Sequence, residues 1–266
     1  MDVEKIEGDI YKSSSQNQSI ISRLAPSLVF YTDIISIVVR ASRKAKRNRY
    51  DTSDWCLSSI ETLRALERVG VQLEISGMNS FKMLEGSCVF IGNHMSTLET
   101  FVLPTLIAPY KDATFVVKQN LIEYPVFKYV MRARNPITVG RSNPRDDLKA
   151  VLEGGMERLH AGISIIIFPQ TTRTPVFDPA QFNTIGVKLA KKADVPVVPI
   201  ALKTDAWGNG RYLKDYGRID PAKKVYIAFG KPIKIKDRGA EEHQQIVQFV
   251  MEKLNSWNQE LESGSS

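Results

Sequence analysis

"CVFIGNHMSTLET" (residues 88–100) contains a short apolar run that passes through a polar turn into a helical stretch. Runs that are apolar on both faces, such as residues 88–92, are typical of strands in a parallel sheet covered by helices on both sides. Six further short runs rich in β-branched residues alternate with helical patterns, at 71–75, 114–118, 137–140, 164–168, 195–202 and 224–230. The sequence therefore predicts the α/β class, with a largely parallel central sheet flanked by helices.

The first 70 residues predict an N-terminal amphipathic helical appendage to this sheet. Residues 1–20 are expected to be poorly ordered, whereas residues 20–70 hold two helical patterns. Pro26 suits a first helical turn, and apolar residues within 28–39 crowd one side of the first pattern. The run "RASRKAKRNR" (residues 40–49), with six basic residues and no acid, separates the two patterns.

Two interpretations of this appendage stay open. An apolar face joined to a polybasic stretch is typical of an interfacial membrane anchor, in which each Lys or Arg near an anionic surface adds roughly 1 kcal/mol. The alternative is a helix that packs on the core and is followed by a solvated charge run. For an anchor, the expected membrane contacts are Phe30, Arg40, Arg43, Lys44, Lys46 and Arg47.

The composition favours anionic partners, because 36 Lys and Arg against 29 Asp and Glu leave a formal charge of +7. The chain begins without the apolar core of a signal peptide, and the apolar run at 24–39 is shorter than the ~20 residues of a spanning helix. Two cysteines, and no Cys or His cluster at ligand spacing, predict a reducing cytosol and no metal site. We expect an α/β domain over residues 71–262 and a flexible tail at 263–266.

His94 falls where a predicted strand turns into a helix, the usual place for ligand sites in an open α/β sheet. Glu99, five residues later, supports two hypotheses. Ser96 and Glu99 have the spacing of a capping box, in which a hydroxyl and a carboxylate cap the helix start. Alternatively Glu99 orients His94 as a general base, because capping alone gives the histidine no role.

Three other predicted strands end near a cation. Lys118 closes residues 114–118, Arg141 follows residues 137–140, and Arg173 lies in the turn after residues 164–168. A hydroxyl such as that of Thr172 beside a guanidinium suits a phosphate, which Arg grips with a bidentate fork. Because the carboxyl ends of parallel strands share one edge of a sheet, these cations and His94 are expected to lie together.

The order of these motifs resembles the glycerolipid acyltransferases that acylate lysophosphatidic acid. Their motifs NHxxxxD, KxEL, a Gly-rich stretch ending in Arg, FPEGTR and VPVxPV correspond to "NHMSTLE" (93–99), "KQNL" (118–121), "GR" (140–141), "FPQTTR" (168–173) and "VPVVPIAL" (195–202). The resemblance covers about residues 85–230. It implies that His94 is the general base, that Glu99 is its partner, and that the acceptor's phosphate is bound by Lys118, Arg141 and Arg173, to which the neighbouring hydroxyl of Thr172 adds a fourth expected contact.

The same resemblance implies substrates and a location. An acyl thioester, acyl-CoA or acyl-ACP, would donate its chain to the free hydroxyl of lysophosphatidic acid or a related lysophospholipid, and no cofactor is needed. The protein would be peripheral on the cytoplasmic face of an anionic membrane, with an acyl carrier protein as a further expected partner. Gln170 would contact the acceptor, and the acyl chain would be lined by Leu121, Ile122, Tyr124, Val126 and Phe127.

Three departures from the family pattern leave alternative functions open. Glu99 stands where the family has Asp, and Gln170 and Thr171 replace the Glu and Gly of FPEGTR. The lost carboxylate motivates two hypotheses, a catalytically weakened lipid-binding protein and an acyltransferase for another lyso-lipid or glycerol-3-phosphate. Nucleic-acid binding through residues 40–49 ranks last, because no aromatic residues that could stack on bases interleave the run.

Overall fold

An eight-stranded sheet crosses the centre of the structure, a computed structural model that describes residues 9–13, 18–140, 142–170, 172–211 and 214–263. The strand order is β1-β2-β8-β7-β3-β6-β4-β5, and all neighbours are parallel except β1 with β2 and β7 with β8. This confirms the largely parallel sheet. The strands are β1 (Ile10–Lys12), β2 (Leu73–Ser76), β3 (Val89–Gly92), β4 (Ala113–Lys118), β5 (Ile137–Val139), β6 (Ser164–Ile167), β7 (Val197–Lys203) and β8 (Val225–Phe229).

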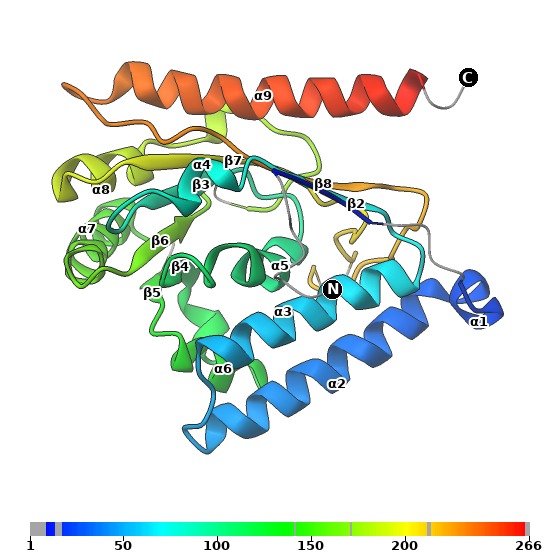
Figure 1. The fold of residues 1–266 in the computed structure, drawn as a ribbon. Coiled ribbons are helices and arrows are strands. Elements are labelled where there is room, and N and C mark those ends of the chain that lie inside the picture. Colours follow the sequence, from blue (N-terminus) through cyan, green and yellow to red (C-terminus); the bar gives the residue numbers. More distant parts are fainter. Residues whose placement is uncertain (1–8, 14–17, 141, 171, 212–213, 264–266) are drawn as a thin grey trace.

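Helices cover both faces of the sheet (Figure 1). One face packs on α2, α3, α5 and α6, and the other on α7, α8 and α9. Strand β3 shows why its sequence lacks polar alternation, since Phe90 joins the first core while Val89 and Ile91 join the second. The helices are α1 (Ile20–Leu24), α2 (Pro26–Lys46), α3 (Thr52–Arg68), α4 (Asn79–Lys82), α5 (Leu98–Ile107), α6 (Phe127–Ala133), α7 (Pro144–His160), α8 (Ile185–Ala193) and α9 (Ala240–Ser263), with 3₁₀ turns at Gln119–Ile122 and Pro179–Gln181.

Two helices on the second face have clear ends. The side chain of Asn143 caps α7 by accepting from the backbone N–H of Arg145 at 3.0 Å. Helix α9 starts at Ala240 and continues to Ser263, the first residue of the predicted tail. The remainder of the predicted tail, residues 264–266, lies outside the described residues.

Residues 1–20 are expected to be poorly ordered, and this expectation is wrong for Ile10–Lys12, which form strand β1. Strand β1 pairs antiparallel with β2, and Ile10 lies opposite Ser76. The Tyr11 hydroxyl donates to Glu67 of α3 at 2.5 Å. A local reading missed this strand because its pairing partner lies more than sixty residues away.

Helix α2 runs through most of the basic stretch and ends at Lys46, so the break between the two helical patterns is shorter than predicted. Its amphipathic character is confirmed, but the core face holds Phe30, which is 0% exposed and packs edge-on against Trp207 with ring centroids 4.9 Å apart. The prediction that Phe30 contacts a membrane is therefore wrong. The exposed apolar residues of this region are instead Ile20, Ile21, Leu24, Leu28 and Ile35.

Candidate active site

His94 follows the carboxyl end of β3, and its ring is held from two sides. The imidazole Nδ1 lies 2.9 Å from Glu99 Oε2, and the ring stacks on Phe168 with centroids 4.5 Å apart and planes 5° from parallel. The side chain of His94 is 15% exposed, whereas that of Glu99 is fully buried. The geometry therefore brings together the predicted base and its predicted partner.

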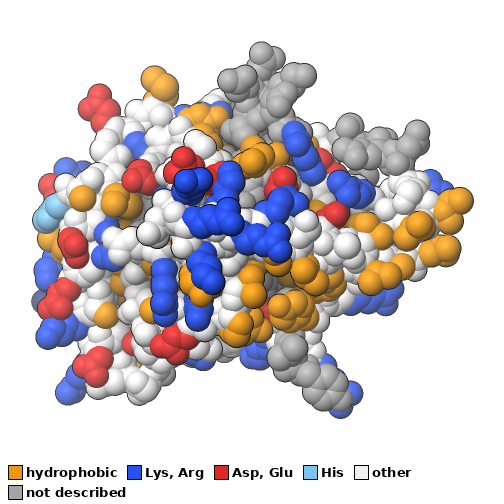
Figure 2. All heavy atoms as spheres, turned by 90° about the horizontal axis from the view of Figure 1, so that it is seen from below, with side chains coloured by type: hydrophobic (Ala, Val, Ile, Leu, Met, Phe, Trp, Pro, Cys, Tyr) orange, Lys and Arg blue, Asp and Glu red, His pale blue; other side chains and the backbone are white. Residues whose placement is uncertain are grey.

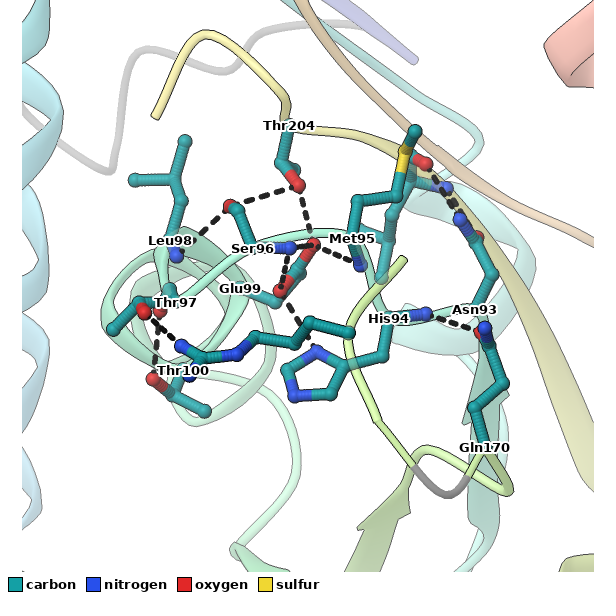
Figure 3. A network of polar contacts seen from close by, with 12 residues as sticks. Asn93, His94, Met95, Ser96, Thr97, Leu98, Glu99, Thr100, Gln170 and Thr204 are labelled. Carbon is teal, nitrogen blue, oxygen red and sulfur yellow. Dashed lines mark hydrogen bonds and ion pairs between the residues drawn. The ribbon is translucent and has the colours of Figure 1, made fainter. Parts of the chain in front are cut away.

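Glu99 also caps the start of α5, so one carboxylate makes both the capping contacts and the contact with His94. Its Oε1 accepts from the backbone N–H groups of Met95 and Ser96, both at 3.0 Å, and from the Thr204 hydroxyl. These contacts surround the carboxylate in Figure 3. The predicted capping box is only half formed, because the Ser96 hydroxyl accepts from the N–H of Leu98 at 3.1 Å and not from that of Glu99.

The Glu99 carboxylate favours one tautomer of the neutral His94 ring. An ionised carboxylate only accepts hydrogen bonds, so the tautomer that suits Oε2 at 2.9 Å carries its proton on Nδ1. In that tautomer the opposite nitrogen, Nε2, has a free lone pair. An orienting carboxylate on one nitrogen and a lone pair on the other are what a general base requires.

Gln170 is a positioning residue in this structure. Its side-chain oxygen accepts from the backbone N–H of His94 at 2.6 Å, and its nitrogen donates to the Thr174 hydroxyl at 3.2 Å. The backbone N–H of Thr174 in turn donates to the His94 carbonyl at 3.0 Å. Gln170 is 5% exposed and both ends of its amide are engaged, so the predicted contact with the acceptor is not supported. Its role is to tie the turn after β6 to His94.

A cavity of about 830 Å³ opens beside His94. Helices α2, α5 and α6, strand β4 and the connection after β7 all contribute to its wall. Four predicted acyl-chain residues line it, but Ile122 packs against the core and is absent from the described lining. The residues confirmed in the lining are Leu121, Tyr124, Val126 and Phe127.

Three predicted phosphate ligands line the same cavity, namely Lys118, Thr172 and Arg173. Arg141, the fourth, lies outside the described residues. Arg173 is already paired, since its Nη1 lies 2.6 Å from Asp215 Oδ1 and donates to the Thr97 hydroxyl. The Thr172 hydroxyl accepts from Lys214 at 3.4 Å.

Sequence reasoning missed four site residues: Phe168, Thr204, Lys214 and Asp215. Phe168 and Thr204 directly follow β6 and β7, and their position at strand ends is a signal that could have found them. Lys214 and Asp215 lie in the long connection between β7 and β8, where no local pattern points to the cavity.

The described residues contain no group of three or more His, Cys, Asp or Glu side chains placed to hold a metal ion. None of the helices in the described part of the chain combines the length and apolar character needed to span a bilayer. Burial raises the pKa of the Cys88 thiol to about 11, and this cysteine lies in the core below β3 rather than in the cavity. The site is therefore built around His94 and the neighbouring cations.

Comparison with known proteins places this site in a family. Residues 63–203 match the profile of the Acyltransferase family, and this stretch contains His94, Glu99, Lys118 and Arg173. The chain belongs to that family, as its motifs predict.

Among its relatives, the chain is 33% identical over 174 residues to a 1-acyl-sn-glycerol-3-phosphate acyltransferase of Pseudomonas aeruginosa, a match that covers 65% of each chain. It is 30% identical over 129 residues to the chloroplastic 1-acyl-sn-glycerol-3-phosphate acyltransferase BAT2 of Brassica napus, a match that covers 48% of this chain and 36% of the relative. The chain thus spans less than two thirds of these relatives. The fold also matches the crystal structure of PlsC, the 1-acyl-sn-glycerophosphate acyltransferase of Thermotoga maritima, with a TM-score of 0.65, 19% identity, and coverage of 90% of this chain and 97% of that one.

Proposed function

We propose that this protein transfers an acyl chain from a thioester, acyl-CoA or acyl-ACP, to the free hydroxyl of lysophosphatidic acid or a closely related lysophospholipid. The observation that carries the proposal is the histidine whose Nδ1 faces a buried carboxylate while its ring lines a cavity that also holds cations. Family membership and the printed names of the relatives support the same reaction class.

In this mechanism, Nε2 of His94 takes the proton of the acceptor hydroxyl as its oxygen attacks the thioester carbonyl carbon. The carbon–sulfur bond of the resulting tetrahedral intermediate then breaks, and the imidazolium returns its proton to the leaving thiolate. Glu99 stabilises the imidazolium through Nδ1. Because the thioester is already activated, no covalent enzyme intermediate is needed, and a positioned base contributes typically ~10²–10⁴-fold.

The rest of the cavity suits the two ends of the substrates. Lys118, Arg173 and Thr172 supply donors for a phosphate, and the lining residues from α2 and α6 are aliphatic or aromatic. Leu121, Tyr124, Val126 and Phe127 would contact the acyl chain. Gln170 gives no reason to expect a weakened enzyme, because its amide supports the backbone of His94 rather than facing a substrate.

We also propose that the protein binds peripherally to an anionic membrane, on the cytoplasmic face, through α1 and the start of α2. The exposed apolar side chains Ile20, Ile21, Leu24 and Leu28 support this, being 66–81% exposed. Figure 2 shows hydrophobic side chains gathered at the end of the lower face where α1 lies, with Lys and Arg side chains nearer the middle. Of the five basic residues predicted to contact lipid, Arg40 and Lys44 pair with Glu61 and Asp54 of α3, which leaves Arg43, Lys46 and Arg47.

Release of free thiol from acyl-CoA and from acyl-ACP, with and without lysophosphatidic acid, tests the reaction. Wild-type protein should release thiol only when the acceptor is present, and mass spectrometry should find phosphatidic acid. His94→Ala should lose at least ~100-fold of this rate. A protein that binds lysophosphatidic acid but releases no thiol from either donor is a binder, and the proposal would then be wrong.

Flotation with anionic vesicles tests the membrane contact. Deleting residues 1–50 is a poor test, because it would also remove Phe30 from the core. Leu24→Ser with Leu28→Ser leaves the core intact and should lower the bound fraction at least about tenfold, because the two apolar side chains no longer enter the interface. The matched control is Met83→Ser with Met251→Ser, which removes two exposed apolar side chains elsewhere. Equal flotation of the two variants would contradict the proposed contact.

A further inference from the structure

The segment Lys214–Gly217, in the connection from β7 to β8, contacts two parts of the cavity wall, the loop after β6 and the start of α5. Lys214 donates to the Thr172 hydroxyl at 3.4 Å. Asp215 Oδ1 lies 2.6 Å from Arg173 Nη1 and accepts from the Thr97 hydroxyl at 3.2 Å. All of these residues line the cavity beside His94. The segment therefore adds polar side chains that the family motifs do not contain.

Helix α2 holds the backbone at the C-terminal end of this segment. The Tyr31 hydroxyl of α2 donates to the Gly217 carbonyl, and the backbone N–H of Ile219 donates to the Ser27 hydroxyl at 3.0 Å. Burial raises the pKa of Tyr31 to about 12, so its hydroxyl stays a donor. The chain also crosses itself closely, because a Cβ at Gly217 would lie 1.8 Å from the Gly208 carbonyl oxygen. Lys214 and Asp215 are thus presented to the cavity by an anchored backbone.

The charges around the cavity do not cancel. Among the described residues of its wall, three cations face one carboxylate: Lys118, Arg173 and Lys214 against Asp215. Asp215 is bonded directly to Arg173 and fixes the guanidinium against Thr97, so it offsets that cation. Within the described part of the chain, Lys118 and Lys214 have no carboxylate partner and remain as two uncompensated positive charges. A phosphomonoester carries between one and a half and two negative charges near pH 7, whereas a phosphodiester carries one.

We propose that Lys214 is the residue that selects an acceptor with a terminal phosphomonoester over one with a phosphodiester, by binding the second negative charge. This inference rests on the proposed function, since it assigns the phosphate of the acceptor to the cavity beside His94. Its basis is the position of Lys214 against Thr172, next to Arg173, together with the two uncompensated charges. Asp215 acts as a positioning residue for Arg173.

The test compares two short-chain lysolipids below their micelle concentrations, lysophosphatidic acid and lysophosphatidylglycerol, which is a diester without an ammonium group. Dissociation constants are measured by calorimetry on the full chain carrying His94→Ala, so that binding is read without turnover. Adding Lys214→Gln should weaken binding of lysophosphatidic acid by about 10- to 100-fold, the usual effect of a hydrogen bond to a charged group. Binding of the diester should change by less than about threefold.

The matched control is Lys192→Gln on α8, which removes the same charge from the helices on the other face of the sheet. It should change neither constant, and a thermal melt of each variant checks that the fold is retained. A pH series gives a second readout, because the phosphomonoester gains its second charge near pH 6. Preference for lysophosphatidic acid should rise between about pH 5.5 and 7.5 with Lys214 present and stay flat with Lys214→Gln.

Equal losses for both lipids, or no loss for either, would overturn the role of Lys214. Failure of the proposed function gives a different result, because it is read from thiol release by the protein with His94 intact. Selective binding that needs Lys214 without any acyl transfer would retain this inference and reject the reaction. If the protein transfers acyl chains and Lys214→Gln still prefers lysophosphatidic acid over the diester, the reaction stands and the role of Lys214 is rejected.

Discussion

Replacing Glu99 by Gln changes the atom that faces His94 and keeps the two shorter contacts that cap α5, losing only the 3.2 Å contact between Oε2 and the Ser96 N–H. The Gln oxygen must lie where Oε1 lies now, because that position receives the N–H groups of Met95 and Ser96 at 3.0 Å. Turning the amide around would place its NH₂ against these two donors. The NH₂ group is therefore forced into the position of Oε2, which lies 2.9 Å from His94 Nδ1.

An NH₂ group at that position reverses the hydrogen bond. Nδ1 must become the acceptor, so the ring proton moves to Nε2, the nitrogen that is proposed to act as the base. Keeping the original tautomer would set two donors against each other and lose a charge-assisted hydrogen bond worth about 1.5–3 kcal/mol. With the lone pair facing away from the acceptor, we expect kcat for acyl transfer to fall by about 10²–10⁴-fold, with little change in acceptor KM.

Thiol release at saturating lysophosphatidic acid measures this loss. The matched control is Glu242→Gln, another buried carboxylate that accepts a backbone N–H, from Lys236 at 3.0 Å, but that lies on α9 away from the cavity. Thermal melts should show that both variants fold. If Glu99→Gln retains a rate within about threefold of wild type, far below the usual size of acid–base effects, Glu99 is only a cap and the proposed tautomer is wrong.

Three further predictions concern the scaffold. Phe30→Ala should lower the free energy of unfolding, measured by urea titration, by about 3–5 kcal/mol. Leu28→Ala, at an exposed position of the same helix, should lower it by less than about 1 kcal/mol, and similar losses for the two variants would contradict the assigned helix face. Gly217→Ala should destabilise the protein by more than about 2 kcal/mol, because its Cβ would meet the Gly208 carbonyl, and a neutral result would show that this crossing is loose. Because burial raises the pKa of Cys88 to about 11, the thiol should resist iodoacetamide at pH 8–9 until urea unfolds the chain. Rapid modification of Cys88 in the folded protein, detected by mass spectrometry, would refute its burial.

The strands were predictable because each is buried on both faces, and such burial requires a continuous run of apolar residues that can be recognised in the sequence. All seven predicted strands form, and the edge at which they end brings His94, Lys118 and Arg173 to one cavity. The face of a helix is harder to predict when both sides carry apolar residues. On α2 the sequence could not tell that Phe30 meets Trp207 while Leu28 meets solvent, because the choice depends on a residue of the distant connection after β7.

The amino-acid sequence by itself predicted the α/β class and the order of the strands along the chain, and it offered the pair formed by His94 and Glu99 as one of two hypotheses. These features depend on period, on turn residues and on a spacing of five positions, all of which are local. Only the tertiary structure decided how the site is supported and charged. Thr204 reaches Glu99 across 105 positions, and Asp215 meets Arg173 through a connection with no sequence pattern of its own. Contacts of that kind arise when the sheet brings separate strand ends together, so no local stretch of sequence encodes them.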